Sequence, residues 1–223
     1  GYFLTLIHSG GRMIFIENEK ILFTTGYLGY YLLSQEMNSM FGKIISIDLN
    51  TKEHEVIAMG TRNAQGLYYD QNKKVIIHTE HGPNGGDEIN INLNPDNKIV
   101  ENFGWPISSY GLPYEKEDWL KKNLPKKNHK DFGFIEPIKY WIPSTPIGQI
   151  IKIPKTFNEK FTNDFFVGFL GWKYQTSNEI QNILHIRFNE SYDEILFEET
   201  IPIGERVRDL IFLESEKKVL MIL

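Results

Sequence analysis

The chain has 223 residues, a mass of 26.1 kDa, 41% hydrophobic and 24% charged residues, a composition typical of a globular protein with a substantial core. No stretch approaches the roughly 20 apolar residues of a membrane-spanning helix, and a net charge of −5 lacks the basic field that drives nucleic-acid binding. The absence of cysteine excludes disulfides, thiolate nucleophiles and cysteine-ligated zinc.

Strand signals run the length of the chain. Short runs of β-branched and aromatic residues are bounded by Gly, Asn, Asp or Lys, as is typical of strands joined by turns. The predicted strands are 12–16, 20–25, 43–48, 66–70, 74–79, 148–153, 164–170, 182–188, 208–213 and 219–223. Helix signals are confined to two short segments, 32–40 and 115–124. The sequence therefore predicts an all-β protein.

A weak repeat suggests how the strands are arranged. Segments 10–25, 65–79 and 208–222 each read as a strand, a charged turn and a strand. The first two lie roughly 50 residues apart, near the period of a propeller blade, which predicts four or five blades in a single β-propeller domain, 1–223. The proline-rich segment 101–139 is predicted to be a loop excursion from one blade.

The ends of the chain are unusual for a domain. It begins with Gly rather than Met and stops inside the apolar run 219–223, whereas domains usually end in polar residues. Residues 1–7 are apolar but too short for a signal peptide and lack its basic region. We therefore expect a piece of a longer protein, with an incomplete ring of blades.

The segment 80–90 (Glu-His-Gly-Pro-Asn-Gly-Gly-Asp-Glu-Ile-Asn) is rich in oxygen ligands. Two adjacent acids follow a Gly-Gly bend, and the carbonyls of Gly82 and Pro83 precede it, a set that suits a hard cation such as calcium. The spacing does not match an EF-hand loop. The alternative is a turn whose acids face water.

Two further clusters offer donors to an anionic or oxygen-rich ligand. The segment 61–66 (Thr-Arg-Asn-Ala-Gln-Gly) suits a planar, oxygen-rich molecule, or else it is a polar surface loop. Arg206 and Arg208 would share one face of a strand about 7 Å apart and could bind a carboxylate. Their alternative partners are Glu205, Asp209 or an acid of a neighbouring blade.

His8 precedes a predicted strand and is either a catalytic base or a structural residue. His81 touches the acidic segment and stays undecided. The sequence has no nucleophile elbow, phosphate loop or zinc-protease histidine pair. The other histidines are expected to be structural residues without a partner: His54, His78, His129 and His185.

In their order along the chain, these segments resemble the soluble quinoprotein sugar dehydrogenases, the family of aldose sugar dehydrogenase and glucose/sorbosone dehydrogenase. Members of that family are six-bladed β-propellers that use pyrroloquinoline quinone (PQQ) and calcium. The most specific matches are 62–67, 80–90, 102–106 and 109–111, with supporting matches at 8–12, 38–43, 140–144, 166–170 and 206–209. The resemblance implies a partial propeller that lacks its first blade and closing strand.

The resemblance also implies roles for individual residues. His8 matches the general base that takes the proton from the anomeric hydroxyl of the sugar. Arg62 matches the residue that polarises the accepting carbonyl of the quinone. The remaining residues implied to contact the cofactor are Asn63, Gln65, Tyr114, Lys173, Arg206 and Arg208, and Tyr114 also borders the sugar pocket.

Two calcium sites are implied as well. The carbonyls of Gly82 and Pro83 match ligands of the calcium that bridges to the quinone. Glu88 and the carbonyl of Phe103 resemble a separate structural calcium site.

The sequence departs from the family pattern at four places. Ile7 replaces an acid or amide, the family's cofactor-binding lysine position holds Gly171, and Lys173 lies two residues later. The segment 143–148 is shortened, and the acid expected near 26–29 is absent. These departures favour weaker quinone binding or a relative that has lost catalysis.

We expect an oxidoreductase that converts aldoses to lactones with PQQ and calcium and passes electrons to a soluble or membrane acceptor. The resemblance implies a periplasmic or secreted protein, leaves a homodimer open, and predicts that the 223-residue piece by itself is inactive. The alternatives are a propeller-type binding module without the quinone, and a structural interaction domain in which protein acids neutralise Arg206 and Arg208.

Overall fold

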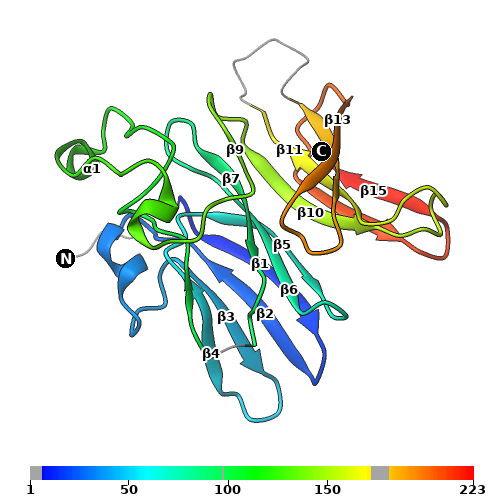
Figure 1. The fold of residues 1–223 in the computed structure, drawn as a ribbon, viewed down its shortest axis with the longest axis horizontal. Coiled ribbons are helices and arrows are strands. Elements are labelled where there is room, and N and C mark those ends of the chain that lie inside the picture. Colours follow the sequence, from blue (N-terminus) through cyan, green and yellow to red (C-terminus); the bar gives the residue numbers. More distant parts are fainter. Residues whose placement is uncertain (1–6, 97, 172–180) are drawn as a thin grey trace. The chain divides into compact units, whose positions relative to one another are not determined.

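The computed structural model describes residues 7–96, 98–171 and 181–223 (Figure 1). Strands dominate, which confirms the all-β prediction. The helical elements are α1 (Asp118–Lys122) and the 3₁₀ helices η1 (Tyr31–Gln35) and η2 (His129–Phe132). None of the described helices is long and apolar enough to cross a membrane.

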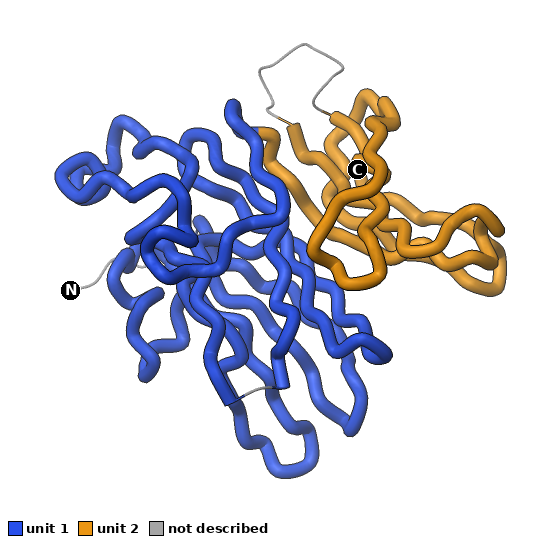
Figure 2. Tube along the Cα trace, viewed as in Figure 1, with its two compact units in different colours: residues 1–144 blue, residues 145–223 orange. Residues whose placement is uncertain are grey.

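The chain divides into two compact units, residues 1–144 and 145–223, coloured separately in Figure 2. Unit 1 contains two sheets, and unit 2 contains a four-stranded sheet and a hairpin. We describe each unit by itself.

The first sheet of unit 1 has the strand order β1-β2-β3-β4-β8. Its first four strands pair antiparallel, and β8 adds a short parallel edge beside β4. The strand bounds are β1 (Gly10–Ile16), β2 (Lys20–Thr25), β3 (Lys43–Asp48), β4 (His54–Met59) and β8 (Glu101–Asn102).

The second sheet of unit 1 is antiparallel, with the order β5-β6-β7-β9. Its strands are β5 (Ala64–Asp70), β6 (Val75–Glu80), β7 (Asp87–Asn92) and β9 (Lys139–Trp141). Buried apolar side chains from both sheets and from the loop after β8 form one core cluster, which contains Leu22, Ile44, Ala58, Leu67, Ile76 and Phe103.

Unit 2 carries an antiparallel sheet of order β10-β11-β12-β13 and the separate hairpin β14-β15. The strands are β10 (Ile147–Ile153), β11 (Asp164–Phe169), β12 (Asn182–Phe188), β13 (Ile195–Pro202), β14 (Asp209–Leu213) and β15 (Lys218–Ile222). The core of unit 2 joins the sheet to the hairpin through Ile153, Phe166, Ile183, Val207 and Leu210.

The three repeated segments all form antiparallel hairpins: β1-β2, β5-β6 and β14-β15. Each places a residue with positive φ immediately before its second strand, namely Glu19 (φ 54°), Lys74 (φ 55°) and Lys217 (φ 51°). The left-handed residue turns the chain back into the partner strand. The repeat seen in the sequence is therefore a repeat of hairpin geometry.

The segment between β8 and β9 is the predicted loop excursion. Its regular elements are the single turn of α1 and the 3₁₀ turn η2, and the rest is irregular. Backbone hydrogen bonds tie it to unit 1, since Trp105 N donates to Gly60 O at 2.9 Å and Leu112 N donates to Asn84 O at 2.9 Å. The loop is thereby fixed against the sheet ends that carry the candidate site.

Candidate functional site

His8 lies in the turn that leads into β1, and its backbone has a φ of 61°, a conformation uncommon for a residue other than glycine. The carbonyl of His8 accepts from Leu28 N at 3.3 Å, and Ser9 O accepts from Gly26 N at 2.8 Å. A Cβ at Gly26 would lie 1.8 Å from His8 O, so this close approach requires glycine. The backbone around Gly26 thus fixes the conformation of the turn that carries His8.

Arg62 lies in the loop that joins β4 to β5 and is 1% exposed. Its Nη1 donates to His81 O at 3.0 Å and to Gly82 O at 2.6 Å. Its Nη2 lies 3.3 Å from His8 Nε2 and 3.7 Å from Glu117 Oε1. The predicted base and the predicted polarising arginine are therefore in direct contact.

Three aromatic rings surround the guanidinium of Arg62. Its Cζ lies 5.4 Å from the ring centre of Tyr27, 5.2 Å from Trp105 and 5.9 Å from Tyr114. The His8 ring also stacks on Tyr27, with centroids 5.2 Å apart and planes 21° apart. Aromatic faces stabilise a cation that burial has stripped of water.

Glu117, from the turn that precedes α1, supplies the carboxylate of this cluster. Its Oε1 accepts from the hydroxyls of Tyr27 and Tyr31 at 3.4 and 3.5 Å, and its Oε2 accepts from Tyr114 N at 2.8 Å. The sequence analysis did not select Glu117, Tyr27 or Trp105. All three lie in segments noted there for other reasons: Trp105 in 102–106, Tyr27 in 26–29 and Glu117 in the predicted helix 115–124.

The pKa of His8 is lowered from 6.5 to about 3, first by burial and then by the positive charge of Arg62 and by His81. The imidazole is therefore neutral at physiological pH. His8 Nδ1 and Arg62 Nε are buried without a hydrogen-bond partner in the described part of the chain. Buried polar atoms are normally paired, so these two atoms point to a ligand.

Asn63 and Gln65 lie beside this pair and hold the His8 turn. Asn63 Oδ1 accepts from Gly10 N at 3.1 Å and from Gln65 Nε2 at 2.8 Å. Its Nδ2 lies 3.5 Å from His81 Nδ1. The two amides join the start of β1 to the start of β5.

The carbonyls of Gly82 and Pro83 face the same cluster. Gly82 O accepts from Arg62, and Pro83 O accepts from the Tyr114 hydroxyl at 3.3 Å. Gly82 N donates to Asp87 Oδ1 at 3.0 Å, so a carboxylate lies beside the backbone N–H of the same residue. Each carbonyl keeps a second lone pair, so this oxygen set fits a calcium ion, which would compete with Arg62 for Gly82 O.

The second calcium site implied by the resemblance does not fit the side chains present. The imidazole of His129 lies between its two expected ligands, with Nδ1 3.0 Å from Phe103 O and Nε2 3.3 Å from Glu88 Oε1. Burial is the largest single influence and lowers the pKa of His129, but Glu88, Glu136 and the Phe103 carbonyl together outweigh it, so the pKa is raised overall. Among the described residues, no group of three or more His, Asp or Glu side chains is arranged to hold a metal ion.

Arg206 and Arg208 belong to unit 2 and precede β14, where the sequence had placed Arg208 at the start of a strand. Arg206 Nη1 donates to Gly171 O at 2.9 Å, while its Nε is buried without a partner in the described residues. Burial and then Arg208 lower the pKa of Arg206. Across residues 7–96, 98–171 and 181–223, neither arginine forms an ion pair with a carboxylate. Lys173 lies outside the described residues.

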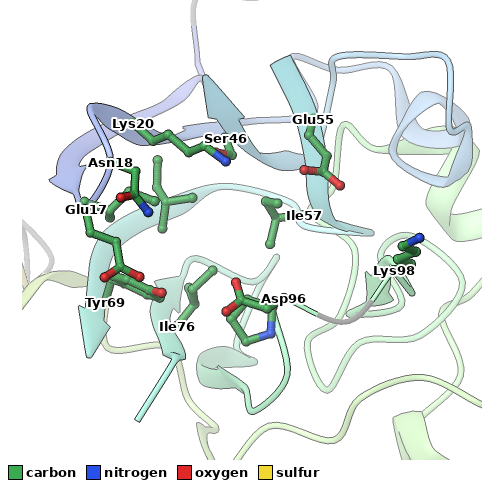
Figure 3. Close-up of a pocket in the computed structure, with 13 residues that line it drawn as sticks. Glu17, Asn18, Lys20, Ser46, Glu55, Ile57, Tyr69, Ile76, Asp96 and Lys98 are labelled. Atoms are coloured by element: carbon green, nitrogen blue, oxygen red, sulfur yellow. The ribbon is translucent and has the colours of Figure 1, made fainter. Parts of the chain in front are cut away.

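A cavity of unit 1, about 250 Å³ in volume, lies at the opposite ends of the strands from His8 and Arg62 (Figure 3). It is bordered by the β1-β2 turn and the ends of β3 and β5, whereas His8 and Arg62 precede β1 and β5. Lysine, carboxylate and apolar side chains line it. The residues labelled in Figure 3 include Glu17, Lys20, Glu55, Ile57, Tyr69 and Asp96. It is separate from the candidate site.

Comparison with known proteins agrees with this fold. Residues 5–218 match the family model described as glucose/sorbosone dehydrogenase, so the chain belongs to that family. The PQQ-bound form of an aldose sugar dehydrogenase from Streptomyces coelicolor has a similar structure, with a TM-score of 0.65 and 21% identity over 94% of this chain and 54% of that one. The predicted fold class, a partial β-propeller of the quinoprotein glucose dehydrogenase type, is confirmed.

Curated relatives match over most of this chain. The protein slr1608 of Synechocystis is 28% identical over 91% of this chain and 50% of its own length. The aldose sugar dehydrogenase YliI of Escherichia coli is 27% identical over 73% of this chain and 45% of its own length. The chain thus spans about half the length of these relatives.

Proposed function

We propose that the protein oxidises aldose sugars to lactones with PQQ and calcium. The contact between His8 and Arg62 carries this proposal, because it joins a neutral base to a buried cation and leaves one polar atom on each without a partner. Membership of the glucose/sorbosone dehydrogenase family supports a sugar dehydrogenase. The names of the E. coli relative and the Streptomyces neighbour support the substrate class and the cofactor.

His8 would act as the general base. Its Nε2 faces a guanidinium N–H, so the neutral ring accepts at Nε2 and carries its own proton on Nδ1. The anomeric hydroxyl would replace the Arg62 N–H at Nε2 and pass its proton to that nitrogen. A ring with a pKa near 3 is a weak base, and an anionic ligand beside Arg62 would raise that pKa toward the working pH.

Arg62 would stabilise the negative charge that develops on the accepting oxygen. Bound PQQ supplies the hydride acceptor, so the sugar loses one hydride and one proton and becomes a lactone. Tyr27, Trp105 and Tyr114 exclude water from the guanidinium, which strengthens its field. Asn63 and Gln65 would keep the His8 turn aligned, and Arg206 with Arg208 would bind the carboxylates of the cofactor.

The remaining assignments belong to the same proposal. The carbonyls of Gly82 and Pro83 would ligate calcium, and Lys173 would contribute a cation to the quinone. Electrons would pass to a soluble or membrane acceptor. The protein would be periplasmic or secreted, and it would act alone or as a homodimer. Inactivity of the 223-residue chain by itself stays a prediction.

The test is an activity assay on the full-length protein with PQQ, calcium, a panel of aldoses and an artificial electron acceptor. We expect wild-type turnover and a loss of at least about 100-fold in kcat for His8→Asn, the scale of a lost general base. The exposed His54 provides the matched control, since His54→Asn keeps wild-type activity. Equal activity of His8→Asn and wild type would exclude His8 as the base.

A binding module without quinone chemistry is the second candidate. The observation that favours it is the pair of hydrogen bonds that Arg62 Nη1 already makes with the carbonyls of His81 and Gly82. On this alternative, calorimetry would detect calcium binding but no heat on addition of PQQ.

A further inference from the structure

The buried side chain of His129 occupies the place where a cation would have to sit to bridge Glu88 and Phe103. His129 is 1% exposed, and its Nδ1 contacts Phe103 O at 3.0 Å and Ser108 Oγ at 2.9 Å. Its Nε2 lies 3.3 Å from Glu88 Oε1. One ring therefore spans both groups.

The backbone holds this ring in place. The turn η2 begins after Asn128 (φ 65°) and ends at Gly133 (φ 79°), both in the left-handed region. Two backbone hydrogen bonds fix the chain that follows the turn. Phe134 N donates to His129 O at 3.2 Å, and Ile135 N donates to Asn102 O at 2.9 Å. These contacts fix the backbone position from which the ring extends.

Packing around the ring leaves no room for a second occupant. Tyr110 covers it with centroids 5.3 Å apart, and a Cβ at Gly104 would lie 3.0 Å from His129 Nδ1. Glu88 Oε2 accepts from Asn90 Nδ2 at 3.1 Å, so both oxygens of this carboxylate already have neighbours. Calcium needs six to eight oxygen ligands, and an imidazole is not one of them.

We infer that His129 replaces the structural calcium of the family and takes over its task of joining the loop 101–139 to β7. The same loop carries Tyr114 and Glu117 to the candidate active site, so a pair of side chains, rather than an ion, fixes their position. The inference does not depend on the proposed dehydrogenase activity.

The test compares calcium stoichiometry by equilibrium dialysis for full-length wild type, Glu88→Gln and the control Glu190→Gln, an exposed glutamate of unit 2. We expect all three proteins to bind the same number of calcium ions, whatever the number at Gly82 and Pro83. Loss of one equivalent in Glu88→Gln alone would overturn the inference. PQQ and sugar are absent, so failure of the proposed function would not affect this result.

A second measurement tests the joining role in calcium-free buffer. His129→Ala should lower the Tm by roughly 3–6 °C and speed proteolytic cleavage within 101–139. Glu88→Gln added to His129→Ala should lower the Tm by less than Glu88→Gln alone, because its partner is already gone. An unchanged Tm in His129→Ala would overturn the inference, and a protein too unstable to purify still leaves the stoichiometry of Glu88→Gln as the test.

Discussion

His8 combines a strained backbone, a stacked ring and a cationic neighbour within one turn. Burial and the charge of Arg62 depress its pKa, and Gly26 and Asn63 fix the turn that carries it. A polar ring kept in a strained turn beside a buried cation is typical of a functional position.

The lowered pKa predicts how His8 changes stability with pH. The folded value of about 3 lies below the ordinary 6.5, so the unfolded chain binds the proton first as the pH falls. The Tm of wild type should fall relative to that of His8→Asn as the pH falls from 6.5 toward 3. Above pH 7 the difference between the two Tm values should stay constant. Tm values at pH 7.5, 6 and 4.5 check this. A constant difference across the series would contradict the depressed pKa.

Glu117 should act as a positioning residue for Arg62. Glu117→Gln keeps the size of the side chain and removes the charge 3.7 Å from Nη2. We expect kcat to fall by about 10-fold, the factor that corresponds to roughly 1.4 kcal/mol, with less change in KM. The matched control is Glu115→Gln, an exposed residue two positions earlier, which should leave kcat unchanged. Equal effects of the two substitutions would mean that Glu117 has no specific role.

The sequence predicted only part of this cluster. His8, Arg62, Asn63 and Gln65 stand in segments with an unusual density of polar side chains before strands. Glu117 lies in an irregular loop, and its partners are far away in sequence. A carboxylate that approaches Arg62 through tertiary folding leaves no local pattern to read.

At the scale of elements, strand prediction succeeded where one face of a strand is clearly apolar. β2, β3 and β12 have the predicted bounds, and the others among the predicted strands differ at their ends by a few residues. The start of β7 lies in the acidic segment 80–90, which the Gly-Gly bend and adjacent acids marked as a cation loop or a turn whose acids face water, yet all six residues of the strand are buried. The polar side of β7 faces buried polar partners, which hydropathy cannot reveal.

Other elements were missed for related reasons. β4 begins with the exposed residues His54 and Glu55, and β13 is mostly exposed, so their apolar runs are short, 56–59 and 195–197. The predicted helices 32–40 and 115–124 shrink to η1 and α1. His185 was expected to have no partner, but its two ring nitrogens lie 2.7 Å from Asp164 Oδ1 and 3.0 Å from Glu199 Oε1.

Asp164 should be critical for the four-stranded sheet of unit 2. It is fully buried at the start of β11 and accepts from Arg187 Nε and Nη2 at 2.9 Å each, besides the contact with His185. Asp164→Asn leaves the arginine without its carboxylate and should cost about 3–5 kcal/mol of unfolding free energy. Urea unfolding checks this, with the exposed Glu190→Gln as control. A loss below about 1 kcal/mol would show that solvent replaces the ion pair.

The carboxyl of Asp164 also makes the stability of this sheet depend on pH in the acidic range. Arg187 and His185 outweigh burial and lower the pKa of Asp164 below its ordinary value of 3.8. Its contribution to stability is fully present above pH 3.8 and is lost as the pH falls through the lowered folded value.

At the scale of the whole molecule, family membership and site chemistry point to the same function. The repeated hairpins predicted a propeller, and the motif order predicted the family, both of which are confirmed.

The most direct measurement is a PQQ titration of the full-length protein in calcium, followed by quinone absorbance, with wild type and Arg62→Lys compared. We predict saturable one-to-one binding by wild type and binding weakened at least about 10-fold in Arg62→Lys, since a lysine cannot reproduce the planar fork of donors. Absence of PQQ binding by wild type would contradict the account. Unchanged affinity in Arg62→Lys would show that the quinone, if bound, does not meet the His8–Arg62 pair.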